Sequence, residues 1–351
     1  MKKNKIKIGI NGLGRIGRHV FRLASKDNDF EIVQINEKVS DLNNWIYTIS
    51  YDTIYGKYLE NLEVDKNYLI LNEKKIKTSN KNIISDVPWG ESNIDYIIDC
   101  TGIKENVKKA RSILERKEVK KVFISHSPDD VDFTMVLGVN EKLYDNKKHN
   151  LIASSICDAT AIAPIAKLIN EKFKIISGYV TTLHPWLSYQ NLMDGPSSSW
   201  SMPGEVYHHY ALGRSSIGNL IPKPTTAVDA VLKVIPELNK ETLGSFSYRT
   251  PTQIVGSADL TFLVEKNLLL SEILEVFQYY ESNQNYPILK LCKDPLVSLD
   301  FVKEPFSCVV DKRWLNVING NLIKCVLWYD NEYGYASNII RQLKLVHSMI
   351  E

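Results

Sequence analysis

The sequence has few cysteines, and none of them form a pair at metal-binding spacing. An odd number of cysteines without a CxxC pair is typical of a reduced cytosolic protein and argues against a disulfide framework or a zinc site. His208 and His209 are adjacent, so both cannot face one site from a regular element, and we expect no bound metal. The five cysteines are Cys100, Cys157, Cys292, Cys308 and Cys325.

A long apolar run, a secretory leader and a strong net charge are also missing. No segment is apolar over the roughly 20 residues that cross a bilayer. Residues 1–6 lead into an expected strand without an apolar leader core. The net charge is only +2, which gives no reason to expect a nucleic-acid or lipid partner. We therefore expect a cytoplasmic protein that binds neither membranes nor nucleic acid.

The overall composition is that of a folded globular protein. Hydrophobic residues make up 44% of the chain and charged residues 24%, which excludes extensive disorder. A length of 351 residues suits about two domains. We find no internal repeat and no low-complexity linker.

A glycine-rich turn follows the first expected strand. Residues 5–10 (KIKIGI) read as a strand, and residues 15–25 as a helix. Between them lies a GxGxxG motif formed by Gly12, Gly14 and Gly17. Glycines at these positions allow a tight turn, close approach of the backbone to a pyrophosphate and close helix packing, while the helix N-terminus favours the phosphate charge. A dinucleotide site is therefore predicted here.

A second strand, residues 31–35, ends at Asn36-Glu37. A carboxylate about twenty residues beyond the last glycine can accept hydrogen bonds from the adenosine ribose and would repel a 2′-phosphate. Glu37 could also be a solvated residue at a strand end. The order of strand, glycine turn, helix, strand and acid favours the dinucleotide interpretation, with NAD as the cofactor.

Further strands are expected on the same sheet. Small polar residues follow two of them, at Thr101-Gly102 and Ser125, and such strand ends line the dinucleotide crevice of a doubly wound sheet. The strands are expected at residues 94–99, 119–125, 133–139 and 150–154.

Cys157 lies where an extended run changes to a helical pattern. Apolar residues Ile162, Ile165, Ala166 and Ile169 recur on one face of that helix. A cysteine at a helix N-terminus is favoured as a thiolate by the helix dipole, which makes it a candidate nucleophile. The alternative is a cysteine packed in the core.

His184 ends a strand at residues 177–183 and is the candidate base for Cys157. A histidine here could be purely structural. Paired with the cysteine, an imidazolium would hold the thiolate, and an imidazole would remove the proton of a hemithioacetal while a hydride leaves to a nicotinamide. A dinucleotide domain together with this pair implies oxidation of an aldehyde through a thioester.

The region after Cys157 predicts a second domain with a mostly antiparallel sheet. A long polar loop, residues 186–213, interrupts it, and loops of this length are usually functional. The chain ends in a helix over residues 334–349. Further strands are expected at residues 244–249, 256–265, 306–310 and 322–329. The predicted fold is α/β, with a Rossmann-type doubly wound parallel sheet and an α+β catalytic domain.

Seven segments resemble the glyceraldehyde-3-phosphate dehydrogenase family, including its erythrose-4-phosphate dehydrogenase branch, over nearly the whole chain. The segments are INGLGRIGR (10–18), YDTIYGK (51–57), DCTG (99–102), GVNEKLYD (138–145), TTLH (181–184), KVIPELN (233–239) and WYDNEYGYASN (328–338).

This resemblance implies domain boundaries and an assembly. Residues 1–156 with the C-terminal helix 331–351 would form the NAD-binding domain, and residues 157–330 the catalytic domain. Residues 186–213 would be the family's S-loop, which reaches toward a neighbour's cofactor in a homotetramer.

The resemblance also implies roles for individual residues. Cys157 would be the nucleophile and His184 its base. Arg15 and Ile16 would contact the pyrophosphate, Glu37 the ribose, Thr101 and Ser125 the nicotinamide side, and Asn331 the carboxamide. The full set of expected cofactor-binding residues is Asn11, Gly12, Gly14, Arg15, Ile16, Glu37, Thr101, Gly102, Ser125, Asn331 and Tyr335. The expected substrate-binding residues are Asp158, Thr225, Thr226, Arg249 and Arg214.

The sequence departs from the family pattern at the phosphate sites. Members usually carry Ser-Cys-Thr-Thr-Asn around the nucleophile, whereas Ile156 and Asp158 flank Cys157 here. Each change removes a hydrogen-bond donor, and Asp158 adds a negative charge that would also raise the pKa of the Cys157 thiol. An anion beside Asp158 would bind poorly unless that carboxylate is paired or protonated.

Other departures lie farther along the chain. Leu187 and Tyr189 stand where the family has polar residues, and its phosphate-facing arginine falls on Leu212, although Arg214 and Arg249 remain. Its threonine–glycine pair is here Thr225-Thr226.

These residues lead to one main expectation and three alternatives. The main one is an NAD-dependent aldehyde dehydrogenase whose sugar-derived or phosphorylated substrate is recognised through an altered phosphate site, so that the thioester is hydrolysed. The alternatives are a phosphorylating glycolytic enzyme, a relative of the semialdehyde dehydrogenases, and a non-catalytic NAD-binding scaffold. The ending YDNEYGY and the GRIGR helix argue against the semialdehyde dehydrogenases.

Overall fold

The computed structural model describes residues 5–196, 200–202, 205–206 and 210–349. Their contacts form two compact units. The first contains the chain up to Thr134, residues 144–154 and the chain from Ile339, and the second contains residues 135–143 and 155–338. No helix among the described residues is long and apolar enough to cross a membrane. His208 and His209 lie outside the described residues.

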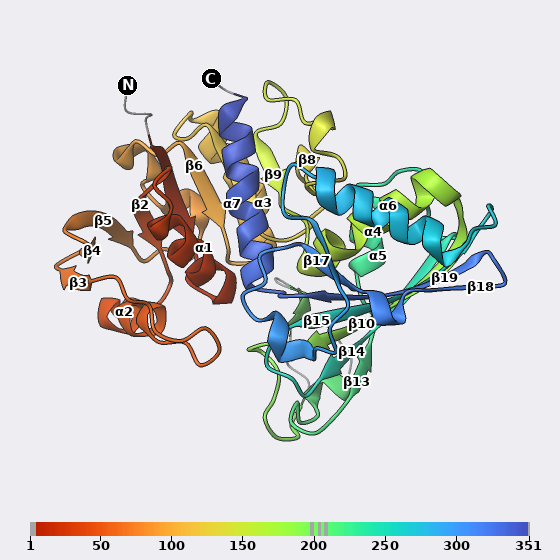
Figure 1. Cartoon of the computed structure of the whole chain (residues 1–351). Coiled ribbons are helices and arrows are strands. Elements are labelled where there is room, and N and C mark those ends of the chain that lie inside the picture. The colour runs from red at the N-terminus through yellow and green to blue at the C-terminus, as the bar shows by residue number, and fades with distance from the viewer. Residues whose placement is uncertain (1–4, 197–199, 203–204, 207–209, 350–351) are drawn as a thin grey trace. The chain divides into compact units, whose positions relative to one another are not determined.

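A nine-stranded, largely parallel sheet forms the first unit (Figure 1), in the order β3-β4-β5-β2-β1-β6-β7-β9-β8. Its helices are α1 (Arg15–Lys26), α2 (Leu42–Ser50) and α3 (Lys104–Glu115). Its strands are β1 (Ile6–Asn11), β2 (Phe30–Asn36), β3 (Leu62–Asp65), β4 (Tyr68–Leu71), β5 (Lys74–Ser79), β6 (Tyr96–Asp99), β7 (Lys121–Ile124), β8 (Phe133–Thr134) and β9 (Leu151–Ala153).

The order of this sheet reverses at β1. Strand β1 pairs in parallel with β2 on one side and with β6 on the other. The carboxyl ends of β1 and β6 therefore meet, and Asn11 Nδ2 donates to Asp99 Oδ1 at 2.9 Å. A crevice outside such a reversal is where doubly wound sheets bind dinucleotides. The expected Rossmann-type sheet is confirmed.

The expected strand over residues 133–139 is wrong for most of its length. Only Phe133–Thr134 is a strand, and residues 137–140 form a turn. The Val136 N–H donates to Asn140 Oδ1 at 2.9 Å, so a side chain replaces the strand partner. Met135, Val136 and Leu137 are buried, and their apolar run reflects burial in the second unit rather than extension.

The second unit contains an eight-stranded sheet that is mostly antiparallel, in the order β13-β14-β10-β15-β19-β17-β16 with β18 paired to β19. The exceptions are the parallel pairs β10–β14 and β16–β17. Its helices are α4 (Cys157–Phe173), α5 (Ala227–Leu232) and α6 (Leu270–Asn283). Its strands are β10 (Ile175–Pro185), β13 (Ile221–Lys223), β14 (Leu243–Thr250), β15 (Gly256–Val264), β16 (Leu289–Cys292), β17 (Cys308–Asp311), β18 (Asn316–Ile318) and β19 (Leu322–Tyr329).

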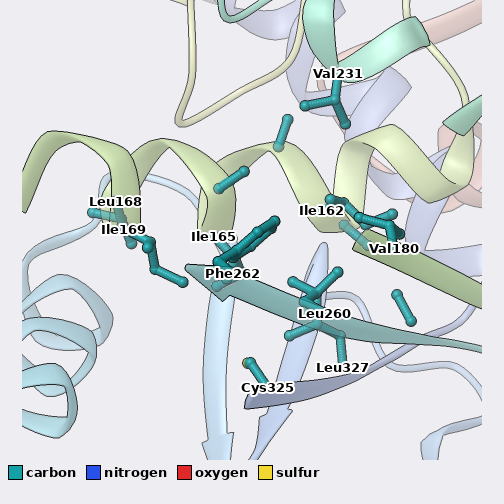
Figure 2. Packing of buried hydrophobic residues seen from close by; sticks show 14 of the residues in the cluster. Ile162, Ile165, Leu168, Ile169, Val180, Val231, Leu260, Phe262, Cys325 and Leu327 are labelled. Carbon is teal, nitrogen blue, oxygen red and sulfur yellow. The ribbon is translucent and has the colours of Figure 1, made fainter. Parts of the chain in front are cut away.

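Helix α4 is the centre of the apolar core of this unit. Figure 2 shows Ile162, Ile165 and Ile169 of α4 beside Leu260 and Phe262 of β15. All five side chains are essentially inaccessible to solvent. Burial of this area fixes α4 against the sheet, and with it the position of Cys157 at the first residue of the helix.

The expected S-loop is only partly irregular. A two-stranded ribbon pairs β11 (Trp200–Met202) with β12 (Glu205–Val206), and a short 3-10 helix, η4 (Tyr210–Gly213), follows.

The final helix, α7 (Tyr333–Ser348), contributes to both units, since the contacts change from the second to the first at Ile339. In the first unit, Lys344 forms ion pairs with Asp27 and Asp29, and His347 Nδ1 lies 3.0 Å from the Tyr96 hydroxyl. The contact grouping differs from the expected domains, 1–156 with 331–351 and 157–330, at residues 135–143 and within α7. The expected boundaries stay a prediction.

Candidate active site

The glycine turn between β1 and α1 is tightly packed at two glycines and open at the third. Gly12 has a φ of +92°, which disfavours other residues, and a Cβ on Gly17 would lie 1.9 Å from the Gly12 carbonyl oxygen. A Cβ on Gly14 would meet no atom within 4 Å in the part of the chain that the structure describes. The turn is therefore closed on the side of its own helix, and Gly14 leaves room for a ligand, as a pyrophosphate requires.

The Glu37 carboxylate lies against this turn. Its Oε2 accepts a hydrogen bond of 2.7 Å from the Leu13 N–H. This contact holds a negative charge next to the glycine turn, where the ribose of a dinucleotide would be bound and a 2′-phosphate repelled. The residues at this edge of the sheet thus fit the adenosine half of NAD.

The other expected cofactor residues of the first unit are tied into local networks. Asp99 is fully buried, and burial raises the pKa of its carboxyl to about 6. The Thr101 hydroxyl donates to Asp99 Oδ1 at 2.8 Å and accepts from Asn106 Nδ2. Gly102 has a φ of +67°. The Ser125 N–H donates to the Asp99 carbonyl at 2.9 Å. These bonds fix the strand ends.

Arg15 is held by an acid of its own unit. Its guanidinium forms an ion pair with Asp52 and lies over the Tyr55 ring. Burial opposes ionisation of Asp52, but N–H donors from Tyr55 and Ile54, together with Arg15, lower the pKa of its carboxyl to about 2. The neighbouring Ile16 is partly buried. Contact of either residue with a pyrophosphate stays a prediction.

Cys157 is placed at the helix N-terminus by a backbone turn. Ser155 has a φ of +61°, Ile156 is extended, and α4 begins at Cys157. Burial raises the pKa of the Cys157 thiol well above its usual value, and the neighbouring Asp158 adds to this effect. Both effects oppose the helix dipole and favour the thiol over the thiolate.

His184 Nε2 lies 3.6 Å from Cys157 Sγ. The other ring nitrogen, Nδ1, lies 2.8 Å from the Pro185 carbonyl oxygen, which can only accept, so Nδ1 carries the hydrogen. A neutral ring then presents the Nε2 lone pair to the thiol. This is the arrangement of a general base with its nucleophile.

The environment of the pair works against the expected imidazolium and resting thiolate. Burial lowers the pKa of His184 to about 4, and the nearby Arg249 lowers it further, against the opposing effect of Asp158. These shifts favour a thiol and a neutral imidazole at neutral pH. Ionisation of Cys157 must therefore accompany its attack on a substrate.

The Asp158 carboxylate is not isolated. The hydroxyl of Tyr329 donates to Asp158 Oδ1 at 2.5 Å, and the same oxygen lies 3.9 Å from Cys157 Sγ. Tyr329 is paired across the sheet with Gly256, where a Cβ would come within 2.6 Å of the Tyr329 ring. Because Gly256 has no side chain, the Tyr329 ring can occupy the position from which its hydroxyl reaches Asp158.

Arg249 lies opposite His184 on the neighbouring strand β14. It is 5% exposed. One end of its guanidinium donates to the Tyr189 hydroxyl at 3.0 Å, while its buried Nε has no hydrogen-bond partner among the described residues. An unpartnered buried N–H is costly, and an anion is the ligand that would satisfy it.

Lys223 is a second cation at this site, and the sequence reasoning missed it. It lies on β13 two residues after Ile221, which is opposite Arg249, so Lys223 and Arg249 share a sheet face. Burial lowers the pKa of its ammonium to about 8, and Arg249 acts in the same direction. One signal in the sequence could have found it. If residues 221–223 form a strand, Lys223 lies on the same face as Ile221.

The remaining substrate-site predictions have mixed outcomes. Leu212 is fully buried, whereas Arg214 is exposed and forms an ion pair with Asp194 at 2.7 Å. Thr225 and Thr226 precede α5, and the Thr225 hydroxyl accepts from the Ala227 N–H at 3.2 Å. Their part in substrate binding stays a prediction.

Asn331 and Tyr335 are fixed near the start of α7. Asn331 Oδ1 accepts a hydrogen bond of 3.0 Å from the N–H of Val255, a residue with a φ of +69°. The contact of Asn331 with a carboxamide stays a prediction. The Tyr335 hydroxyl donates to the Ser155 carbonyl at 2.8 Å and so supports the turn before Cys157.

Known proteins are similar to this chain over most of its length. Residues 6–107 match the model of the glyceraldehyde 3-phosphate dehydrogenase NAD-binding domain, and residues 156–331 that of the C-terminal domain. The chain is 37% identical over 335 residues to a glyceraldehyde-3-phosphate dehydrogenase of Colletotrichum lindemuthianum, with 95% of each chain covered. It is 34% identical to glyceraldehyde-3-phosphate dehydrogenase 2 of Caenorhabditis briggsae, with 96% and 97% covered.

A cytosolic relative from a plant is similar to the same extent. Glyceraldehyde-3-phosphate dehydrogenase 3, cytosolic, of Zea mays is 36% identical over 346 residues, which are 98% of this chain and 99% of the relative. Both family models match, and these relatives are more than 30% identical over nearly their full length. The chain therefore belongs to the glyceraldehyde-3-phosphate dehydrogenase family.

Proposed function

We propose that this protein oxidises a sugar-derived or phosphorylated aldehyde with NAD, through a hemithioacetal and a thioester on Cys157, with His184 as the base. The observation that carries the proposal is the 3.6 Å approach of His184 Nε2 to Cys157 Sγ, with the Nδ1 hydrogen held by Pro185. If Cys157 were only a core residue and His184 only structural, the Nε2 lone pair would have no reason to face the thiol.

The general class follows from the family. A member of it is an NAD-dependent oxidoreductase that acts on an aldehyde group. The nicotinamide supplies the acceptor for a hydride. We assign the adenosine half of NAD to Gly12, Gly14 and Glu37 because of the open space at Gly14 and the position of the Glu37 carboxylate.

The cysteine and histidine then exchange protons with the substrate. Nε2 of His184 takes the thiol proton as Sγ bonds to the carbonyl carbon, and returns it to the carbonyl oxygen to give a neutral hemithioacetal. The same nitrogen removes the hydroxyl proton when the hydride leaves, so that a thioester remains. Because His184 is neutral at pH 7, no prior deprotonation of the base is needed.

Two cations and one carboxylate support recognition of an anionic substrate. Arg249 and Lys223 are positive and lie near Asp158, which is negative. This balance leaves one positive charge for a phosphate or carboxylate of the substrate. Asp158 stands directly beside Cys157, so a free phosphate attacking the thioester would be repelled there. Water has no such barrier, and we propose hydrolysis of the thioester.

A second candidate is the phosphorylating enzyme of glycolysis. The observation in its favour is that the buried Nε of Arg249 has no partner within the described ranges. Together with Lys223 it could hold an attacking phosphate in spite of Asp158. A non-catalytic scaffold has less support, because it gives no reason for the orientation of His184.

The test is NADH formation with purified protein, NAD and a panel of phosphorylated and unphosphorylated aldehydes, with and without phosphate. We expect turnover that is independent of phosphate and lost in Cys157→Ser. Phosphate-dependent turnover of glyceraldehyde 3-phosphate would identify the phosphorylating enzyme instead. NAD binding without any NADH formation, in protein whose Cys157 resists alkylation, would favour the scaffold.

We also propose a cytoplasmic homotetramer whose S-loop, residues 186–213, lies near a neighbour's cofactor. Support comes from the family and from the cytosolic relative in maize. Sedimentation velocity would test the assembly.

A further inference from the structure

We propose that Cys157, Asp158 and His184 form a binding site for a divalent transition metal of the zinc class, which reversibly blocks the nucleophile. One sulfur, one carboxylate oxygen and one imidazole nitrogen from these residues all lie within 4.8 Å of one another. Within the described ranges this is the one cluster of three such ligands that could hold a metal ion. The proposal goes beyond the proposed oxidation, and metal binding can be measured without substrate or NAD.

The separation between the sulfur and the imidazole nitrogen matches tetrahedral coordination. Zinc–sulfur bonds of about 2.3 Å and zinc–nitrogen bonds of about 2.0–2.1 Å place the two ligand atoms about 3.6 Å apart. The observed distance from Cys157 Sγ to His184 Nε2 is 3.6 Å. The distance from Cys157 Sγ to Asp158 Oδ1 is 3.9 Å, which a small rotation of the carboxylate would shorten. The three ligand atoms lie within 4.8 Å of one another, so the carboxylate must move toward the imidazole before all three can bind one metal ion.

His184 and Asp158 already have the hydrogen bonds that metal-bound histidines and carboxylates usually make. Metal-bound histidines generally donate their second ring hydrogen to a carbonyl or carboxylate, and ligating carboxylates are themselves hydrogen-bonded. Here His184 Nδ1 donates to the Pro185 carbonyl, and Asp158 accepts from the Tyr329 hydroxyl. The imidazole is thus fixed with its Nε2 lone pair toward the cysteine, in the tautomer that a metal needs.

The charges are also suitable. A neutral imidazole, a thiolate and a carboxylate together balance the two charges of the metal. Binding displaces the Cys157 thiol proton to solvent and so makes the bound state favoured by rising pH. Three protein ligands leave a fourth position for water, as in open rather than structural zinc sites. Arg249 and Lys223 repel the metal, which keeps the site readily reversible.

The consequence is a metal-inhibited state specific to Asp158. The metal occupies the sulfur lone pair and the His184 nitrogen that the reaction requires, so neither an aldehyde nor an alkylating agent can react with Cys157. Removal of the metal by a chelator restores the thiol. Asp158, which departs from the family pattern, thus adds a third metal ligand to Cys157 and His184.

Cobalt(II) added to the metal-free full-length protein provides the direct test. We expect one equivalent to give a sulfur-to-cobalt charge-transfer absorption in the near ultraviolet, which one equivalent of zinc then removes. Cys157→Ser should abolish the band. Asp158→Asn keeps the size of the side chain and an oxygen that accepts from Tyr329, but it removes the charge. It should weaken zinc binding about tenfold or more. Tyr329→Phe removes the hydrogen bond to Asp158 and should weaken zinc binding to a similar extent.

Matched controls separate this site from other thiols and acids. Cys292→Ser alters a partly exposed cysteine elsewhere, and Asp229→Asn an acid that pairs with Lys240. Both should bind cobalt and zinc as the unchanged protein does. A band that persists in Cys157→Ser, or zinc affinity that is unchanged in folded Asp158→Asn, would overturn the proposal. If the unchanged protein formed no NADH, the proposed oxidation would fail, but the cobalt spectra would still test the metal site. The two proposals can therefore fail separately.

Discussion

The hydroxyl of Tyr329 donates a 2.5 Å hydrogen bond to Asp158 beside the nucleophile. Tyr329 ends β19, while Asp158 lies in the first turn of α4, so the bond joins the sheet to the catalytic helix. It stabilises a carboxylate at a position where the family pattern has a threonine. The altered residue is therefore integrated into the site, and its charge should be measurable in the reactivity of Cys157.

Asp158→Asn should make Cys157 more reactive. Asp158 disfavours the thiolate, so removal of its charge lowers the thiol pKa. We expect the rate of alkylation by the neutral reagent iodoacetamide at pH 8 to rise several-fold. Asp229→Asn, on the surface of α5, is the matched control and should leave the rate unchanged. An unaltered rate in Asp158→Asn would show that the carboxylate is not charged.

Gly256→Ala should disturb Asp158 through Tyr329. The new methyl group would lie 2.6 Å from the Tyr329 ring and 2.8 Å from its hydroxyl oxygen, so the tyrosine must shift. We expect a loss of about 1–3 kcal/mol in the free energy of unfolding, which is typical of overpacking. Urea denaturation measures it. A variant as stable as the unchanged protein would mean that Tyr329 has an alternative position.

The pH dependence of alkylation should distinguish a thiol–imidazole pair from a thiolate–imidazolium pair. Burial raises the Cys157 pKa well above 9.0 and lowers that of His184 to about 4. The thiolate fraction, and with it the alkylation rate, should increase about tenfold per pH unit from pH 6 to pH 8. A plateau that begins near pH 6 would instead indicate a resting ion pair.

The acid side of the kcat/KM profile should reflect the same shift. A histidine with a pKa lowered to about 4 remains the neutral base at pH 5, where an ordinary histidine near 6.5 would be protonated. We therefore expect little loss of kcat/KM from His184 between pH 7 and pH 5. A decline centred near pH 6.5 that disappears in a His184 variant would contradict this expectation.

Local patterns predicted the elements that carry the cofactor motif and the nucleophile. The alternation of residues 5–10, the three glycines and the helix from Arg15 are short-range signals, and the structure has all of them. The Cys157 helix was equally visible, because Ile162, Ile165 and Ile169 repeat at helical spacing. These features depend on neighbours in the sequence, so a single chain suffices to find them.

Features that depend on distant residues could not be predicted in this way. Residues 133–139 have a strand-like apolar run, yet a side-chain bond from Asn140 turns the backbone. Lys223 reaches the site only through the pairing of β13 with β14. The neutral state of His184 results from burial and from Arg249, which is 65 positions away. Sequence alone assigns neither cross-strand registers nor the solvent exposure of a single ring.

The glycine turn offers a test that separates folding from cofactor binding. Gly14→Ala places a methyl group in open space and should leave stability unchanged, while it obstructs the approach of a pyrophosphate and weakens NAD binding by about tenfold or more. Gly17→Ala would place a methyl group 1.9 Å from the Gly12 oxygen and should destabilise the fold. Calorimetric titration with NAD and thermal denaturation measure the two effects. Equal stability of both variants would contradict the packing argument.

Lys223 should control the affinity for an anionic aldehyde in a pH-dependent way. Burial lowers its pKa to about 8, so the ammonium is mostly charged at pH 7 and loses its charge as the pH rises through 8. The KM for a phosphorylated or carboxylated aldehyde should therefore increase from pH 7 to pH 9, whereas the KM for a neutral aldehyde should not.

Two variants of Lys223 make the argument specific. Lys223→Met removes the charge but keeps most of the apolar stem, and should raise the KM for the anionic aldehyde at pH 7 by about tenfold, the value of a hydrogen bond to a charged group. Lys223→Arg keeps a charge that does not titrate below pH 10, and should abolish the increase in KM between pH 7 and pH 9. Steady-state kinetics with matched anionic and neutral aldehydes measures both. If Lys223→Met affected the two aldehydes equally, Lys223 would act on the fold of the site rather than on the charge of the substrate.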